Sequence, residues 1–260
     1  MHYDFSLPAF SARFIPVWRR NFLVWKKLAG SSILGNIADP MIALVAFGYG
    51  LGSLLPSVGG VPYIQFLAAG TVCMSTMNAA TFESLYSAFS RMHVQRTWDG
   101  IMNAPVSLED VVLGELTWAA SKAFLSGLAI MIVVWALGLA GGPQSVLILG
   151  VVVLIGLAFS AIGLVVNALA RAYDTFTYYF TLVVTPMAFL SGVFFPVQQL
   201  PGWLQAVAHA LPLSHAVAMA RPLLLGQWPE QPLLNVMVLL LYAAVFAYIA
   251  IVLTRRRLLT

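Results

Sequence analysis

Long apolar runs constrain this chain more than any other feature of its sequence. A transmembrane helix needs about 20 mostly apolar residues, and six runs of about that length are separated by segments rich in Gly, Pro or charge. In lipid, only helices and closed barrels satisfy their own backbone groups, so the runs predict an all-α membrane protein. The expected spans cover residues 33–55, 63–89, 112–139, 145–170, 176–195 and 233–254. Asp39-Pro40 interrupts the first span and leaves its start open.

Charged residues are too few for a water-soluble surface. They make up 8% of the chain, whereas a soluble domain carries about 25%. The lipid bilayer must therefore be the main partner of the chain. The net charge of +4 does not indicate nucleic-acid binding, because the basic residues lie beside apolar spans, where they determine topology.

The positions of Lys and Arg predict the orientation. Five basic residues lie between 13 and 27, two in the loop after the second span, one at 171, and three at 255–257. Only Arg221 falls in a loop on the opposite side. Since basic loops stay in the cytoplasm, we expect both termini to be cytoplasmic.

Residues 1–31 are expected to form an N-terminal arm, followed by one six-span domain at 32–260. Within the arm, residues 12–30 show an apolar face with two Trp residues and a basic face, with Leu23 and Asn21 as exceptions. This pattern is typical of a helix that lies flat at a membrane interface. It could serve only as an anchor, or it could also brace a cytoplasmic partner.

The polar stretch 90–107 separates the second and third spans. Residues 91–102 favour a short helix that stops before Pro105, and Ser107 with Asp110 gives a weak capping box for the next helix. We expect this loop to expose His93, Arg96, Trp98 and Asp99 to the cytosol. Such a loop is longer than a connection requires and predicts a contact site. The alternative is an ordinary solvated helix at the interface.

Residues 196–232 contain six prolines yet remain mostly apolar. Two helical stretches in it are too short to span, which predicts an external re-entrant hairpin, because partial spans must be buried in protein or line a cavity. Trp203, His215 and Arg221 are the candidate residues of an external gate. A simple external cap is the alternative.

Catalytic and metal-binding motifs are absent from the sequence. There is no Gly-Lys dipeptide for a phosphate-binding loop, and no H-E-x-x-H, C-x-x-C or G-x-S-x-G motif. His209 and His215 are poorly spaced for a shared metal. We therefore expect no enzyme activity, no metal and no cofactor in this chain.

Glu83 and Lys122 are charged residues that fall inside predicted spans. Glu83 lies late in the second span and Lys122 early in the third, so antiparallel helices place them at similar depth. Ionisable residues within membranes usually pair, and we expect these two to form an ion pair. The pair could couple loop movement to the core, or it could be static, or each side chain could reach the interface separately.

Two blocks, residues 78–123 and 189–226, resemble the membrane subunit of ABC type-2 exporters, closest to the nodulation-protein-J-like branch. The resemblance covers nearly the whole chain. It implies a homodimer in the bacterial inner membrane, paired with two copies of a cytoplasmic ATPase that uses ATP and Mg. It also implies export of an amphipathic substrate such as a lipo-oligosaccharide, glycolipid, polysaccharide or drug-like molecule. An ATP-independent secondary transporter or channel is the alternative.

The same resemblance assigns a role to the polar stretch. In that family the loop after the second span carries a coupling helix seated in the ATPase, which corresponds here to 91–103. It implies that Arg91, His93, Arg96, Trp98 and Asp99 contact the ATPase.

Overall fold

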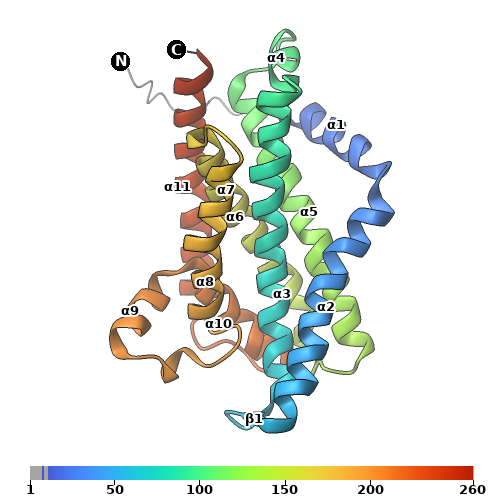
Figure 1. Ribbon diagram of the computed structural model, residues 1–260, viewed down its shortest axis with the longest axis vertical. Coiled ribbons are helices and arrows are strands. Elements are labelled where there is room, and N and C mark those ends of the chain that lie inside the picture. Colours follow the sequence, from blue (N-terminus) through green and yellow to red (C-terminus); the bar gives the residue numbers. More distant parts are fainter. Residues whose placement is uncertain (1–7, 9–10, 260) are drawn as a thin grey trace.

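The computed structural model describes residue 8 and residues 11–259. Residues 1–7, 9 and 10 of the predicted N-terminal arm lie outside the described residues. The chain forms an elongated bundle of helices (Figure 1). The helices are α1 (Phe14–Lys26), α2 (Ala29–Leu54), α3 (Tyr63–Phe82), α4 (Thr97–Met102), α5 (Leu108–Ala136), α6 (Ile148–Leu169), α7 (Asp174–Tyr179), α8 (Thr185–Leu190), α9 (Gly202–Ala210), α10 (Pro212–Leu224) and α11 (Pro232–Leu259). A two-residue antiparallel ribbon, β1 (Ser57–Val58) with β2 (Val61–Pro62), joins α2 to α3.

Three segments of the described chain are long and apolar enough to cross a membrane. They cover Leu108–Ala136, Pro143–Leu169 and Pro232–Leu258, and correspond to the predicted third, fourth and sixth spans. The structure bears out the predominantly helical membrane fold at this level.

The other predicted spans differ in their details. Pro40 lies inside α2, which begins at Ala29, before the predicted start at 33. Residues 191–195 were predicted to end the fifth span, but they are not helical, since the helix ends at Leu190 and Gly192 adopts a positive φ of 77°.

The second predicted span continues well past its expected end. After α3 the helix passes through two π-helical turns, Glu83–Ser87 and Ser90–Val94. We call residues 83–94 the α3 extension. The predicted separate helix at 91–102 is therefore wrong in part: residues 91–94 belong to this extension, and α4 alone is the short helix. Arg96 separates the two, in the left-handed conformation with φ 48°.

The long helix α6 packs closely on its neighbours, because small residues allow short backbone distances. A Cβ added at Gly163 would lie 2.6 Å from Ser84 Cβ, and one at Gly156 would lie 3.1 Å from the carbonyl oxygen of Ala120. One apolar cluster fills most of the bundle, and a second surrounds Trp98 and Phe176.

Helix α1 lies against the bundle. Its residues Val17 and Asn21 are buried, Trp18 Nε1 donates to Ser121 Oγ at 3.0 Å, and the Trp25 ring lies 5.9 Å from the Trp118 ring. The predicted amphipathic helix therefore exists, with part of its apolar face covered by α5.

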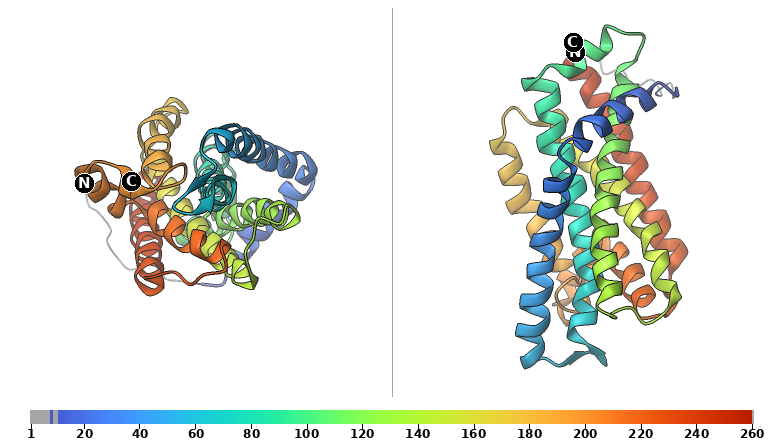
Figure 2. Two further views of the ribbon diagram at one scale, coloured as in Figure 1. Left: turned by 90° about the horizontal axis from the view of Figure 1, so that it is seen from below. Right: turned by 90° about the vertical axis from the view of Figure 1, so that its right-hand side faces the viewer.

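The bundle has two distinct ends (Figures 1 and 2). One end, which we call the α4 end, carries α1, α4 and the C-terminal part of α11. The ribbon β1–β2 and the helices α9 and α10 lie toward the other, which we call the hairpin end.

Candidate functional site

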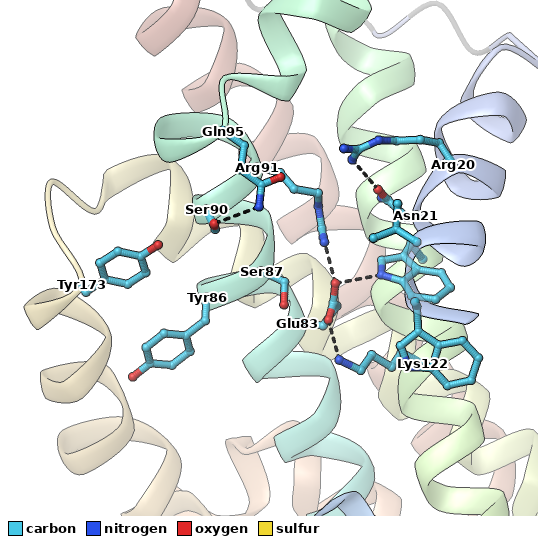
Figure 3. A pocket seen from close by; sticks show the side chains of 13 residues that line it. Arg20, Asn21, Glu83, Tyr86, Ser87, Ser90, Arg91, Gln95, Lys122 and Tyr173 are labelled. Carbon is cyan, nitrogen blue, oxygen red and sulfur yellow. Dashed lines mark hydrogen bonds and ion pairs between the residues drawn. The ribbon is translucent and has the colours of Figure 1, made fainter. Parts of the chain in front are cut away.

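Glu83 is the centre of a buried charged network beneath α4. Its carboxylate accepts hydrogen bonds from Lys122 Nζ at 2.8 Å, from Arg91 Nη2 at 2.8 Å and from Trp118 Nε1 at 2.8 Å. Only 3% of the Glu83 side chain is exposed. Figure 3 shows Arg91 and Lys122 approaching Glu83 from opposite sides. The structure thus brings together Glu83 and Lys122, as expected from their depth in the sequence.

Glu115 is the second carboxylate of the network, and sequence reasoning missed it. Arg91 donates to both of its oxygens, through Nε at 2.9 and 3.0 Å and through Nη2 at 2.5 Å. Trp98 Nε1 donates to Glu115 Oε1 at 3.1 Å. Glu115 precedes Lys122 by seven residues, which is two helical turns, so both lie on one face of α5. The seven-residue spacing from Lys122 was the feature of the sequence that could have identified Glu115 as a member of the network.

The π-helical turns explain how Arg91 reaches the network. In a regular α-helix, residues eight apart differ in direction by about 80°. Each π-turn contains more residues per turn, and it reduces this difference. Arg91 can therefore lie above Glu83 on the face toward α5. Such turns often mark functional positions in helices.

The network is electrically balanced within itself. Two cations, Arg91 and Lys122, meet two carboxylates, Glu83 and Glu115. Because removal of one partner from a buried pair leaves an uncompensated charge, it costs about 3–5 kcal/mol. The four side chains therefore hold the α3 extension and α5 in one relative position.

Two residues of the predicted contact loop are not at its surface. Trp98 was expected to be exposed, yet it is 1% exposed, because its ring fills the second apolar cluster and its indole N–H reaches Glu115. Arg91 was assigned to the ATPase contact, yet its side chain is 13% exposed and turns inward to the two carboxylates. His93, Arg96 and Asp99 are exposed, as predicted.

The surroundings of His93 lower the pKa of its imidazole. Partial burial and the nearby positive charge of Arg257 lower its pKa, and Asp99 opposes this shift only in part. The exposed surface of the loop therefore combines one cation, one anion and one imidazole with a lowered pKa.

Hydrogen bonds fix the entry into α5 and tie both terminal segments to it. Ser107 and Asp110 form the predicted capping box, in which each side chain accepts from the other's backbone N–H at 3.2 Å. Ser11 Oγ also donates to Asp110 at 2.8 Å. Arg255, near the C-terminus, donates to Glu109 at 2.6 and 2.8 Å.

A cavity of about 400 Å³ opens beside the network (Figure 3). Arg20 of α1, Tyr86 and Tyr173 are among the residues that line it, together with Glu83, Arg91 and Lys122. Burial and the positive charge of Arg91 lower the pKa of Arg20, although Glu115 opposes this shift. Movement of α1 would therefore change the surroundings of the network directly.

The three candidate gate residues at the hairpin end are only partly together. Arg221 and His215 line one cavity of about 400 Å³. His215 Nδ1 lies 2.7 Å from Asn235 Oδ1, and its Nε2 lies 2.9 Å from the carbonyl oxygen of His209. Trp203 does not line this cavity and is 70% exposed.

Within residue 8 and residues 11–259, no three His, Cys, Asp or Glu side chains are grouped closely enough to hold a metal ion. The charged network is built of ion pairs and hydrogen bonds, so a movement of α4 can displace α5 and the α3 extension through it. It offers no nucleophile activated by a neighbouring base.

Comparison with known proteins agrees with the resemblance of blocks 78–123 and 189–226. A family model described as ABC-2 type transporter matches residues 13–225. Nodulation protein J of Rhizobium meliloti (strain 1021) is 48% identical over 256 residues, which cover 98% of each chain. Nodulation protein J of Rhizobium leguminosarum bv. viciae is 48% identical over 253 residues, 97% of this chain and 98% of the relative. The inner membrane transport permease YadH of Escherichia coli (strain K12) is 25% identical over 214 residues, 81% of this chain and 82% of the relative. The chain therefore belongs to the ABC-2 type transporter family.

Proposed function

We propose that this chain is the permease subunit of an ATP-driven exporter in a bacterial inner membrane. A separate cytoplasmic ATPase, in two copies, supplies the energy by hydrolysing ATP with Mg, and two copies of this chain form the pathway. The cargo is amphipathic, in the class of lipo-oligosaccharides, glycolipids, polysaccharides or drug-like molecules. The family description, ABC-2 type transporter, and the name of one relative, inner membrane transport permease YadH, support a transport role.

In this proposal the chain crosses the membrane six times and its α4 end faces the cytoplasm. The basic helix α1 and the Arg255–Arg257 cluster, both at that end, support this orientation. The hairpin formed by α9 and α10 then lies on the external side. His215 and Arg221 remain candidate gate residues there, while the exposed Trp203 fits an interfacial anchor.

One observation carries the coupling mechanism: a continuous chain of contacts leads from α4 into the spans. Trp98 of α4 bonds to Glu115 of α5, Glu115 bonds to Arg91, and Arg91 bonds to Glu83. The exposed residues His93, Arg96 and Asp99 provide the contact with the ATPase. When the ATPase closes on ATP, force on α4 reaches α5 and the α3 extension through these bonds. Tilting of these helices against the second copy opens the path for the cargo.

The contact surface can be tested by association with the ATPase. Arg96→Ala with Asp99→Ala removes two exposed charges and touches no buried side chain, so the fold should persist. We expect the ATPase to be lost when the tagged double variant is purified from its native host in mild detergent and analysed by mass spectrometry. Arg171→Ala, which removes an exposed cation from another loop, is the control and should retain the ATPase.

Wild-type association of the double variant would remove α4 from the coupling role. If the unmodified chain were isolated alone from several mild detergents, an ATP-independent transporter or channel would be the better description.

The Glu83–Lys122 pair can be tested by charge reversal. Glu83→Lys and Lys122→Glu should each abolish transport, because each places like charges together. The double reversal should restore transport only in part, since Lys at position 83 would still face Arg91. A double variant no better than either single variant, in a transport assay with the ATPase present, would contradict the pairing as a functional element.

A further inference from the structure

At the hairpin end lies a largely buried guanidinium that has no acidic partner among the described residues. Arg221 Nη2 donates to the carbonyl oxygen of Gly192 at 2.5 Å, and Nε and Nη2 reach the carbonyl oxygen of Phe66 at 3.4 Å. Its Cζ lies 3.6 Å from the centroid of the Phe66 ring. In the described part of the chain, no carboxylate forms an ion pair with it. Carbonyl dipoles and a ring reduce the cost of burying a charge, but an anion compensates it far better.

Arg221 lines the cavity of about 400 Å³ that also contains His215, and the rest of its lining is rich in hydrogen-bonding groups. These are Ser191, Gln198, His209, Ser214, Gln231 and Asn235. Glu230 is the one carboxylate in the lining, and it is exposed. Every lining residue comes from 191–235, so this segment builds the cavity by itself.

Two hydroxyl groups in this lining have no hydrogen-bond partner within the described residues. They belong to Ser191, which is 1% exposed, and to Ser214 of α10. A buried polar group without a partner costs about 1–3 kcal/mol. Arg221 also has spare donors, because its Nη1 makes no hydrogen bond to a described residue. Arg221 and the two serines, which come from two separate elements, thus line one cavity.

Gly192 keeps the space beside the guanidinium open. It has a φ of 77°, and a Cβ placed on it would lie 3.9 Å from Arg221 Nη1 and 3.0 Å from Val197 Cγ2. In the turn at 191–192, Gly192 leaves space beside the guanidinium and its carbonyl oxygen orients Arg221. Ser191 adds a hydroxyl that has no partner among the described residues.

We infer that this cavity binds a phosphate or sulfate group, held by the guanidinium of Arg221 and the hydroxyls of Ser191 and Ser214. An oxyanion of this kind offers several acceptor oxygens at once, which suits donors that arrive from different elements. The group can come from the headgroup of a membrane lipid or from a free or cargo-borne anion. This inference does not depend on coupling to an ATPase, because the cavity lies away from the charged network.

Binding can be measured directly with inorganic phosphate. The purified full-length chain is titrated in a phosphate-free, uncharged detergent at constant ionic strength, and binding is followed by phosphorus NMR line broadening. We expect saturable broadening for the wild type, and none for Arg221→Gln. Arg171→Gln makes the same charge change at an exposed position and should bind as the wild type does.

Because Arg221 also holds two backbone carbonyls, Arg221→Gln could disturb the fold. A second variant, Ser191→Ala with Ser214→Ala, removes only hydroxyls that bond to no described residue. It should keep the wild-type unfolding temperature and bind phosphate about tenfold more weakly, as expected for lost hydrogen bonds to a charged group. Absence of saturable binding in the wild type, or equal binding in the wild type and the double serine variant, would overturn the inference.

The same titration in nanodiscs distinguishes the two sources. If a lipid headgroup occupies the cavity, inorganic phosphate should bind more weakly in discs that contain phosphatidylglycerol than in discs made of digalactosyldiacylglycerol, a neutral lipid without phosphate. If the group belongs to a free or cargo-borne anion, both discs should give the same affinity. Either result supports the site, provided that Arg221→Gln abolishes the binding.

Discussion

The guanidinium of Arg91 lies between two carboxylates, with Nη2 2.8 Å from Glu83 and 2.5 Å from Glu115. Both carboxylates are at most 3% exposed, so neither can turn to water. Among the described residues, Lys122 bonds only to Glu83, and it is 21% exposed. At the scale of single residues, the two cations of the network therefore have unequal roles.

Replacement of the two cations should reveal this difference. Arg91→Met removes the one cation that pairs with Glu115 and one of the two cations that pair with Glu83. It should lower the free energy of unfolding by about 3–5 kcal/mol. Lys122→Met leaves Glu83 bound to Arg91 and Trp118, so it should lower the free energy of unfolding clearly less. Thermal unfolding in detergent measures both changes, with Arg171→Met as the exposed control. Equal losses for Arg91→Met and Lys122→Met would contradict the central position of Arg91.

At the scale of elements, contact between α6 and the α3 extension depends on the absence of a side chain. Gly163 lies against Ser84, where an added Cβ would be 2.6 Å from the Ser84 Cβ. Gly150, on the same helix, has nothing within 4 Å of the equivalent position. The two glycines therefore provide a matched comparison within α6.

Gly163→Ala should destabilise the protein by about 1–3 kcal/mol, because the helices would have to move apart. Gly150→Ala should be neutral or stabilising by up to about 1 kcal/mol, since alanine favours the helix. Thermal unfolding in detergent checks both values. A stabilising Gly163→Ala would mean that α6 and the α3 extension do not approach this closely.

Some of these elements could be predicted from the sequence, and others could not. The apolar runs predicted the long helices because their length is set by the membrane, and the local Ser107–Asp110 pattern predicted the start of α5. The depth of Glu83 and Lys122 predicted their pairing. Glu115 was missed because its partner depends on how α5 rotates against the α3 extension, and π-helical turns have no simple sequence pattern. Trp98 was placed at the surface because a polar neighbourhood does not reveal that a ring can turn inward.

At the scale of the whole molecule, the sequence offers a simple way to establish orientation. The chain has one cysteine, Cys73, and it is fully buried. A cysteine introduced at an exposed position is therefore the only one that a water-soluble maleimide can reach. Ser57 in β1 and Gly100 in α4 are both exposed and lie at opposite ends.

The proposed orientation predicts different labelling of the two variants. In intact cells with a permeabilised outer membrane, a membrane-impermeant maleimide should label Ser57→Cys. Gly100→Cys should react only after the inner membrane is opened. The wild-type chain, with buried Cys73, is the control and should stay unlabelled. Labelling of both positions from the same side would require a different topology for α3.

The balance of charge within the network has an electrical consequence. Moving one elementary charge through a membrane potential of 100 mV costs or releases about 2.3 kcal/mol. Arg91 and Lys122 cancel Glu83 and Glu115, so a displacement of these four side chains as a unit transfers no net charge through the field. These four side chains therefore contribute no charge transfer of their own to a conformational step. Any dependence of such a step on the membrane potential must come from other charged groups, such as Glu109 and Asp110 of α5.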